Sequence, residues 1–221
     1  MSTRKSIYRG SMTSTEAREK LERLRERLGL TDLEIIEGRG PDAGVVTLRF
    51  HSGETRIERR CTTQPSAEGN LACLALWLED RARNLERGIE TFHEAFADSI
   101  ALARNDNAQG GFKTSRVNYY EGAKSVDESI EVFRSSFARL HITERDVKVT
   151  WDSDANWARL RMRLPSGAIV EKVSRAQKTT DANLAALALW IQSRARNWER
   201  GIESLDLDRV FAGNLLPAKV A

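Results

Sequence analysis

The chain has 221 residues, of which 40% are hydrophobic and 30% are charged, and its formal net charge is +3. These proportions are typical of globular proteins, and the length allows two modest hydrophobic cores. No apolar run approaches the roughly 18 residues of a membrane span, and the initial MSTRKSIYRG lacks an apolar core, so we expect no membrane partner and a cytoplasmic location. Positive charge is concentrated late in the chain: residues 1–111 contain 17 Lys and Arg against 18 Asp and Glu, whereas residues 112–221 contain 18 against 14.

The first predicted element is an amphipathic helix, whose apolar residues recur every three or four positions: Ala17, Leu21, Leu24 and Leu28. Gly29 follows where helices commonly end. The alternating runs DLEIIE, VVTLRFH and TRIERRC then predict three strands, with a tight hairpin at HSGE. A long helix follows, with inward residues Leu71, Ala75, Leu78, Ala82 and Leu85, and Gly88 ends or bends it.

The second half repeats this order. A helix is predicted from the spacing of Val126, Ile130, Phe133, Phe137 and Leu140, and the runs DVKVTW, WARLRMRL and AIVEKVS predict strands, with PSGA as the hairpin. The last long helix has as its inward residues Leu184, Ala188, Ile191, Ala195 and Trp198, and Gly201 ends or bends it.

The two halves also share sequence. Residues 70–90 and 183–203 align without a gap at an offset of 113 with five differences, and within them RARNLERGIE returns as RARNWERGIE. We therefore predict an α+β fold made of a tandem repeat of two α-β-β-β-α units, residues 1–100 and 118–221, joined by a linker at 101–117. Each unit is expected to be a three-stranded antiparallel sheet with helices on one face and an open second face.

The predicted element order resembles that of the double-stranded RNA-binding domain. Those domains hold phosphates with a Lys-rich start of the final helix and a His-bearing loop between the first two strands. Here the helix starts read TTQPSAEGN and AQKTTDAN, and the loops read EGRGPDAG and DSDANW. The resemblance therefore implies a shared topology and not that mode of RNA binding.

The segment SRAQKTTDANLAALALWIQSRARNWERGI and the later VFAGNLLPA resemble the signature of a family of uncharacterised actinobacterial and phage or mobile-element proteins, often labelled DnaJ-like. The positions that match are Asp181, Asn183, Leu184, Ala186, Ala188, Leu189, Arg200, Gly201, Phe211, Gly213, Leu216 and Pro217. The first unit departs from the signature because it lacks the Leu-Pro end. The His-Pro-Asp loop of a J domain is absent, so the resemblance does not imply chaperone recruitment.

No catalytic pattern is evident. The sequence has no nucleophile with a base at a recognisable spacing, no phosphate-binding glycine loop and no cluster of metal ligands. Cys61 and Cys73 align with Ser174 and Ala186, which favours buried free thiols over duplicated thiol chemistry. We therefore expect a protein without enzymatic activity, cofactor or metal.

The open sheet faces are the first candidate site. If Leu160, Met162 and Leu164 face the helices, the period of two places an aromatic residue and three arginines on the other side: Trp157, Arg159, Arg161 and Arg163. In the first unit, Thr47 and His51 share the outer side with Arg49, Arg56 and Arg60. Guanidinium groups suit phosphates, and tryptophan can stack on an unpaired base. The alternative is that Glu58 and Glu171 neutralise these faces across the strands.

The repeated decapeptide is the second candidate. Its polar residues match between the copies although Glu79 and Asp80 correspond to Gln192 and Ser193, so a local helix ion pair does not explain their identity. We interpret the following residues as an interface between the units around a pseudo-two-fold axis: Trp77, Arg81, Asn84, Trp190, Arg194 and Asn197. A shared ligand-binding surface and a recent duplication are the alternatives.

Two functional hypotheses follow. The first is a non-enzymatic nucleic-acid-binding accessory protein of a phage or other mobile element, which prefers single strands and is a monomer or small homo-oligomer containing an internal pseudo-dimer. The alternative is a protein-interaction or adaptor module, including one related to phage or host defence, which docks through its long helices or strand edges. Salt dependence of binding distinguishes them, because phosphate contacts weaken steeply as salt rises.

Overall fold

The computed structural model describes residues 12–97, 99, 124–202, 207–211 and 214, and the expected linker at 101–117 lies outside these ranges. The architecture is α+β, with two three-stranded antiparallel sheets ordered β1-β2-β3 and β4-β5-β6. At this level the predicted fold class is confirmed. Within the described ranges, none of the helices has the length and apolar character that crossing a membrane requires.

The first half contains, in chain order, α1 (Ser14–Leu28), β1 (Thr31–Glu37), η1 (Gly40–Asp42), β2 (Val46–Ser52), β3 (Thr55–Cys61), α2 (Ala67–Glu86) and α3 (Phe92–Phe96). Helix α1 begins with a capping box, in which Thr13 and Glu16 each satisfy a free backbone N–H of the other. It ends at Gly29, whose φ of 60° lies in the left-handed region that glycine adopts without strain. The predicted order and boundary signals therefore hold in this half.

The second half contains, in chain order, α4 (Val126–Arg139), η2 (Glu144–Asp146), β4 (Val147–Asp152), β5 (Trp157–Arg163), β6 (Ile169–Ser174), α5 (Thr180–Glu199) and α6 (Leu207–Val210). The short helices α3 and α6 were not predicted from the sequence. Helix α3 nevertheless starts with a capping box between Thr91 and Glu94, a signal that is readable in TFHE.

Each half has its own hydrophobic core, formed between a sheet and the helices that cover one of its faces. The inward side chains of the central strands are fully buried, for example Leu48 on β2 and Leu160 on β5. Each core also contains one isoleucine from the other half. Ile89, which follows α2, packs in the second core, and Ile202, which follows α5, packs in the first. The two halves are therefore held together by apolar contacts as well as by polar residues of the long helices. The interface between the halves is here called the seam.

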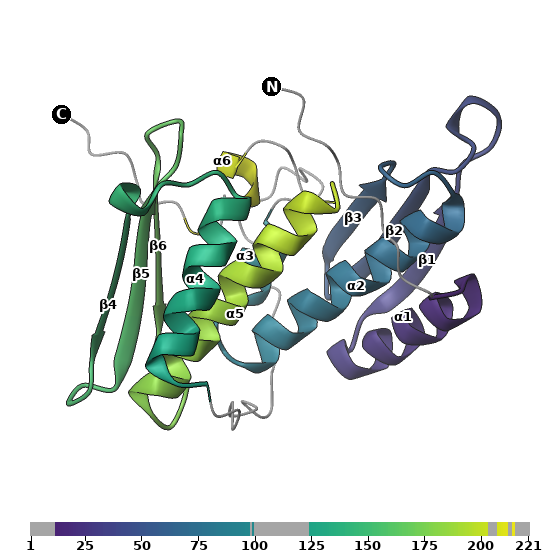
Figure 1. Cartoon of the computed structure of the whole chain (residues 1–221). Helices are drawn as coiled ribbons and strands as arrows, with labels where there is room; N and C mark the ends of the chain where they lie inside the picture. Colours follow the sequence, from purple (N-terminus) through teal and green to yellow (C-terminus); the bar gives the residue numbers. More distant parts are fainter. Residues whose placement is uncertain (1–11, 98, 100–123, 203–206, 212–213, 215–221) are drawn as a thin grey trace.

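The long helices lie in the middle of the molecule. Figure 1 shows α2 and α5 side by side, with the sheet β4-β5-β6 beyond α5 and the sheet β1-β2-β3 on the side of α2, and the two helices are in contact. In Figure 1 the uncovered face of β4-β5-β6 points away from the first half, and that of β1-β2-β3, which lies behind α1 and α2, points to the back of the view. The outer faces of the sheets are therefore separate surfaces. The long helices lie where the halves meet, so their polar residues can contact the other half.

Candidate functional site

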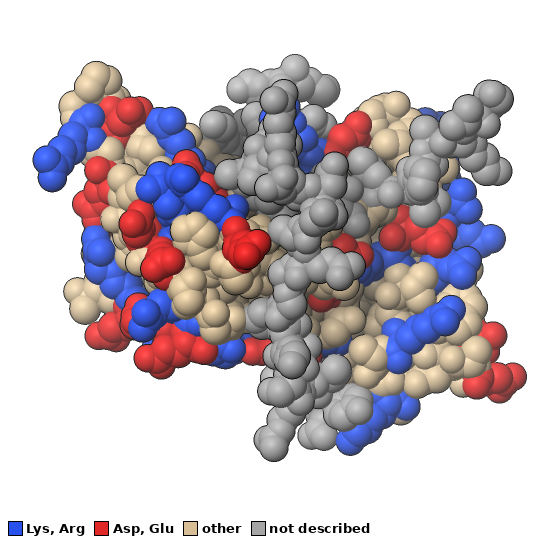
Figure 2. Space-filling model, turned by 180° about the vertical axis from the view of Figure 1, so that it is seen from behind, with Lys and Arg blue, Asp and Glu red and all other residues tan. Residues whose placement is uncertain are grey.

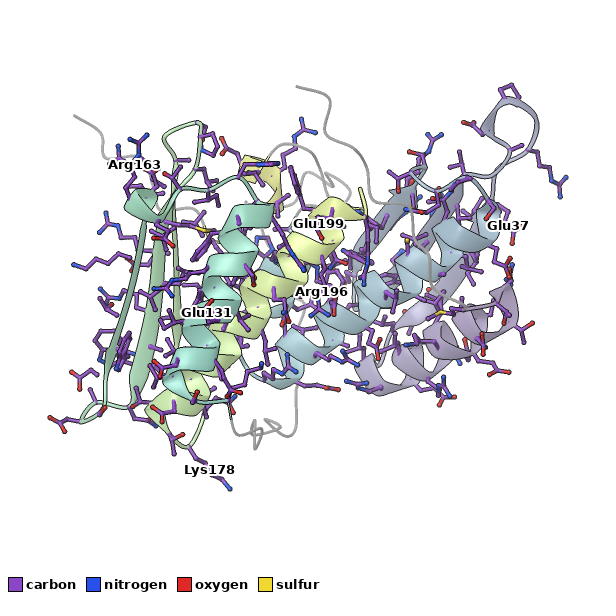
Figure 3. The ribbon with its side chains drawn as sticks, viewed as in Figure 1. Glu37, Glu131, Arg163, Lys178, Arg196 and Glu199 are labelled. Carbon is purple, nitrogen blue, oxygen red and sulfur yellow. The ribbon has the colours of Figure 1, made fainter. Side chains whose placement is uncertain are left out.

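The outer face of the sheet β4-β5-β6, here called the second outer face, is built by the alternation of β5. Ala158, Leu160 and Met162 are buried against the helices. The residues between them point the other way: Trp157 and Arg159 are half-buried, and Arg161 and Arg163 are exposed. Figure 3 shows Arg163 near one end of the sheet, pointing away from the helices. The structure thus brings the four predicted residues together on one side of one strand.

The charges of the second outer face are mostly positive and unneutralised. Lys148 is the cross-strand partner of Arg161 on β4, and Glu171 is its partner on β6. Despite that register, none of the three arginines forms an ion pair with a carboxylate in the described part of the chain. Arg159 instead stacks over the Trp157 ring, with its guanidinium carbon 5.1 Å from the ring centroid. The surface therefore combines a preformed arginine–tryptophan stack with two exposed guanidinium groups.

The outer face of the sheet β1-β2-β3, here called the first outer face, differs. Arg49 pairs with Glu34 at 3.1 Å and with Glu58 at 3.2 Å, and Arg56 pairs with Glu58 at 2.9 Å. Arg60 pairs with Asp42 at 2.8 Å. Burial acts to raise the pKa of Glu58, but hydrogen bonds from Arg56 and Arg49 outweigh it and lower that pKa. The predicted alternative of a neutralised face therefore describes the first sheet.

Figure 2, which views the molecule from behind, shows the same mixing of charge over the first half, where basic and acidic side chains lie next to one another. His51 also lies next to an acidic side chain, because its Nδ1 is 3.4 Å from Asp32 Oδ2. The two faces have related sequences and the same position in their sheets, yet only the second leaves its arginines available for an outside anion.

A buried carboxylate, Glu90, holds the seam between the halves. Its side chain is fully buried and accepts hydrogen bonds from Trp190 Nε1 at 2.8 Å, from Arg194 and from Asn84 Nδ2 at 3.1 Å. Arg81 Nη1 lies 3.9 Å from the same carboxylate. Burial alone would raise the pKa of Glu90, but the charges of Arg194 and Arg81, with the hydrogen bonds, lower it to about 2. Glu90 is therefore ionised and joins α5 to the end of α2.

The six residues predicted to form the interface are all buried, and they contribute unequally. Trp190, Arg194 and Asn84 contact the other half directly; Asn84 Nδ2, for example, donates to Ser193 Oγ at 3.2 Å. In each half the tryptophan lies under the arginine one turn later, at 5.9 Å for Trp77 with Arg81 and 5.9 Å for Trp190 with Arg194. Asn197 is different, because its side chain accepts a hydrogen bond from Arg200 of its own half.

Equivalent residues of the halves make reciprocal hydrogen bonds across the seam. Gln177 Nε2 donates to the backbone carbonyl of Arg87 at 2.9 Å, and Gln64 Nε2 donates to that of Arg200 at 3.4 Å. Thr63 Oγ1 also donates to Arg200 O, at 2.7 Å. The acceptors are the carbonyls of the C-cap residues that directly follow α2 and α5, where backbone carbonyls lack partners within the helix.

The matching arginines Arg83 and Arg196 each bond to the side chain one turn earlier on their own helix. Arg83 pairs with Glu79 at 2.9 Å, and Arg196 donates to Gln192 Oε1 at 3.0 Å, so an amide replaces the carboxylate one turn earlier. Arg196 lies between α5 and α2 in Figure 3, and the charge of the buried Asp80 acts on it. Burial raises the pKa of Asp80, and the nearby arginines oppose that rise.

Sequence reasoning missed Glu90 as a central residue. The available signal was its place as the last residue of the decapeptide, which ends in Glu in both copies. Cys61 and Cys73 are buried free thiols, as expected. No group of His, Cys, Asp and Glu suited to a metal ion occurs within the described ranges.

The chain was also compared with known proteins. No protein-family model, no curated protein and no solved structure matches it. The resemblance of the second unit to the DnaJ-like family therefore stays a prediction from the sequence.

Proposed function

We propose that the second outer face binds the phosphate backbone of single-stranded nucleic acid, without catalysing a reaction on it. The observation that carries this proposal is the row Arg159, Arg161 and Arg163 on one strand, which has no carboxylate partner among the described residues. Guanidinium groups form paired, charge-assisted hydrogen bonds with phosphate oxygens. Successive outward residues are about 6.6 Å apart along a strand, so a row of three can follow several phosphates.

The aromatic residue at the end of this row supports an unpaired strand. Trp157 is half-buried and held by Arg159, so its ring loses little conformational freedom when a base stacks on it. Stacking on an aromatic side chain contributes roughly 1–3 kcal/mol per base and requires an exposed base face. A duplex hides those faces in its own stack, and the site therefore favours single strands.

The first outer face has no part in this proposal, because Arg49, Arg56 and Arg60 already have carboxylate partners. A bound phosphate would have to displace those carboxylates and leave them next to its own negative charge. The excess positive charge of residues 112–221 agrees with a single binding face in the second half.

We also infer that the halves are tandem copies of one unit, related by a pseudo-two-fold axis, with the topology of the double-stranded RNA-binding domain. The reciprocal bonds of Gln64 and Gln177, and the exchanged Ile89 and Ile202, support this, because a two-fold contact uses the same patch twice. The chain is then an internal pseudo-dimer, in which one copy carries the binding face.

A second candidate function is supported by one observation. Trp151, on the edge strand β4, is 43% exposed, the largest exposed fraction among the large hydrophobic side chains that the structure describes. An edge strand has unpaired backbone groups, so a protein partner could add a strand there and cover this ring. The long helices α2 and α5 have less surface for a protein partner to contact, because most of their residues are already buried.

A salt titration tests the main proposal. The affinity of the protein for a fluorescent thymidylate oligonucleotide is measured at increasing salt, for the wild type and for the Arg159→Ala, Arg161→Ala, Arg163→Ala triple variant. Each phosphate contact contributes roughly 0.7 to the slope of log affinity against log salt for single strands, so the triple variant should flatten the slope by about 2. A duplex of the same length should bind more weakly. Absence of salt-dependent binding by the wild type would refute the proposal.

The same assay separates the second candidate. Trp151→Ala should leave oligonucleotide affinity unchanged, because Trp151 points toward the helix side of β4, as its partner Ala158 does on β5. Loss of nucleic-acid binding in this variant would contradict the assignment of the site to the outer face.

A further inference from the structure

A hollow lies beside the arginine–tryptophan stack, at the junction of the two halves. It has a volume of about 520 Å³ and is lined by Val173, Arg175 and Ala176 of the second half and Gly88 of the first. Val173 is the cross-strand partner of Arg159, so both side chains point to the second outer face. The hollow therefore continues that face across the edge of β6 toward the end of α2.

The other half shows why this hollow is open. At the position of Ala176 the first half has Thr63, whose side chain fills the space beside Gly201: a Cβ atom on Gly201 would lie 2.5 Å from Thr63 Cγ2. Thr63 also donates to Arg200 O at 2.7 Å. Ala176 lacks the γ-methyl and hydroxyl groups of threonine, and it lines the hollow together with Gly88. The next residues, Gln64 and Gln177, make equivalent hydrogen bonds to a backbone carbonyl of the other half.

The lining of the hollow suits a flat group that carries a phosphate. Val173 and Ala176 provide an apolar wall to this open hollow. Arg175 is exposed at the end of β6 and has no carboxylate partner among the described residues. It shares the side of Val173 through the alternation of the strand. A guanidinium at the rim of an apolar space matches a nucleobase with its adjoining phosphate.

We infer that this hollow receives one unpaired nucleobase of the bound strand, next to the base stacked on Trp157, with Arg175 holding the adjoining phosphate. This inference rests on the proposed function and deepens it, because it names the bound species as a single strand with one base turned out of the stack. The strand then runs along Arg163, Arg161 and Arg159 and ends its contact at the seam between the halves.

The test compares two oligomers of about 12 residues with the same backbone charge, one of thymidylate and one of abasic tetrahydrofuran residues. Fluorescence anisotropy gives both affinities for the wild type, for Ala176→Thr and for the control Thr63→Ala. Ala176→Thr copies the packing of the first half and should fold, which thermal unfolding checks. Ala176→Leu fills more of the hollow and serves as a second block.

The wild type should bind thymidylate at least about fivefold more tightly than the abasic oligomer. Ala176→Thr and Ala176→Leu should weaken thymidylate binding by about fivefold and leave abasic binding unchanged, whereas Thr63→Ala should change neither. The inference is overturned if the wild type binds both oligomers equally, or if neither Ala176→Thr nor Ala176→Leu changes thymidylate binding. Either result leaves the proposed backbone binding intact. Binding of neither oligomer at low salt refutes the proposed function itself.

Discussion

Trp190 donates a hydrogen bond from its indole nitrogen to Glu90 at 2.8 Å, although the two residues lie 100 positions apart in the chain. Arg194 bonds to the same carboxylate from the next turn of α5, and Arg81 approaches it from α2. A carboxylate without access to water is stable as an anion only when charges and donors surround it. Glu90 therefore joins the two halves through a buried carboxylate that is surrounded by donors from both.

Replacement of this carboxylate should be strongly destabilising. Glu90→Gln keeps the shape of the side chain but removes the charge near Arg81 and Arg194, and breaking a buried pair in this way costs about 3–5 kcal/mol. The free energy of unfolding from urea denaturation measures the loss. Glu131→Gln is the matched control, because Glu131 is 68% exposed in its pair with Arg134 and should cost less than about 1 kcal/mol. Equal effects of the two variants would contradict the role of Glu90.

The stability contributed by Glu90 should also depend on pH in the acid range. Its pKa falls from an ordinary 4.5 to about 2 on folding, so its contribution is fully present above pH 4.5 and is lost as pH falls toward 2. The difference in unfolding free energy between wild type and Glu90→Gln should therefore shrink between these pH values. Asp80 acts in the opposite direction, because burial raises its pKa, so the comparison with Glu90→Gln is needed to isolate Glu90. A difference that stays constant from pH 5 to pH 2 would exclude this linkage.

Local patterns predicted much of this fold, because helix and strand periodicity depend on neighbouring residues alone. The alternation around Leu160 and Met162 gave the correct inner and outer sides of β5. The partners of Glu90 were not predictable in this way, because its donors come from distant segments that meet only when the halves pack. Neutralisation by Glu58 was one of two alternatives that the sequence left open, and strand register decides it for Arg49 by placing Glu58 opposite.

The exchanged isoleucines predict that the two halves unfold together. Ile89→Ala removes a side chain of the first half from the second core, and Ile202→Ala does the reverse, so each should destabilise the protein by about 2–5 kcal/mol. Tryptophan fluorescence and far-UV circular dichroism should then report one coincident transition for the wild type and both variants. Two separated transitions, with one half still folded, would show that the seam does not couple the cores.

The paired arginines of the first outer face should not contribute to binding. The Arg49→Ala, Arg56→Ala, Arg60→Ala triple variant removes the same number of positive charges as the triple variant of the second outer face. Because each of these arginines already pairs with a carboxylate, the slope of log affinity against log salt should stay within about 0.5 of the wild-type slope. A decrease of about 2 would show that both faces bind the strand.

Photochemical cross-linking shows directly whether the second outer face contacts the strand, because it reports contact without any substitution. A thymidylate oligonucleotide containing 5-iododeoxyuridine is bound to the wild type and irradiated, and mass spectrometry identifies the cross-linked residues. We expect cross-links on β5, at Trp157 above all, that disappear when unlabelled single strand competes and persist when an equal amount of duplex is added. Cross-links confined to the first sheet, or to Trp151 on the opposite side of the second sheet, would contradict it.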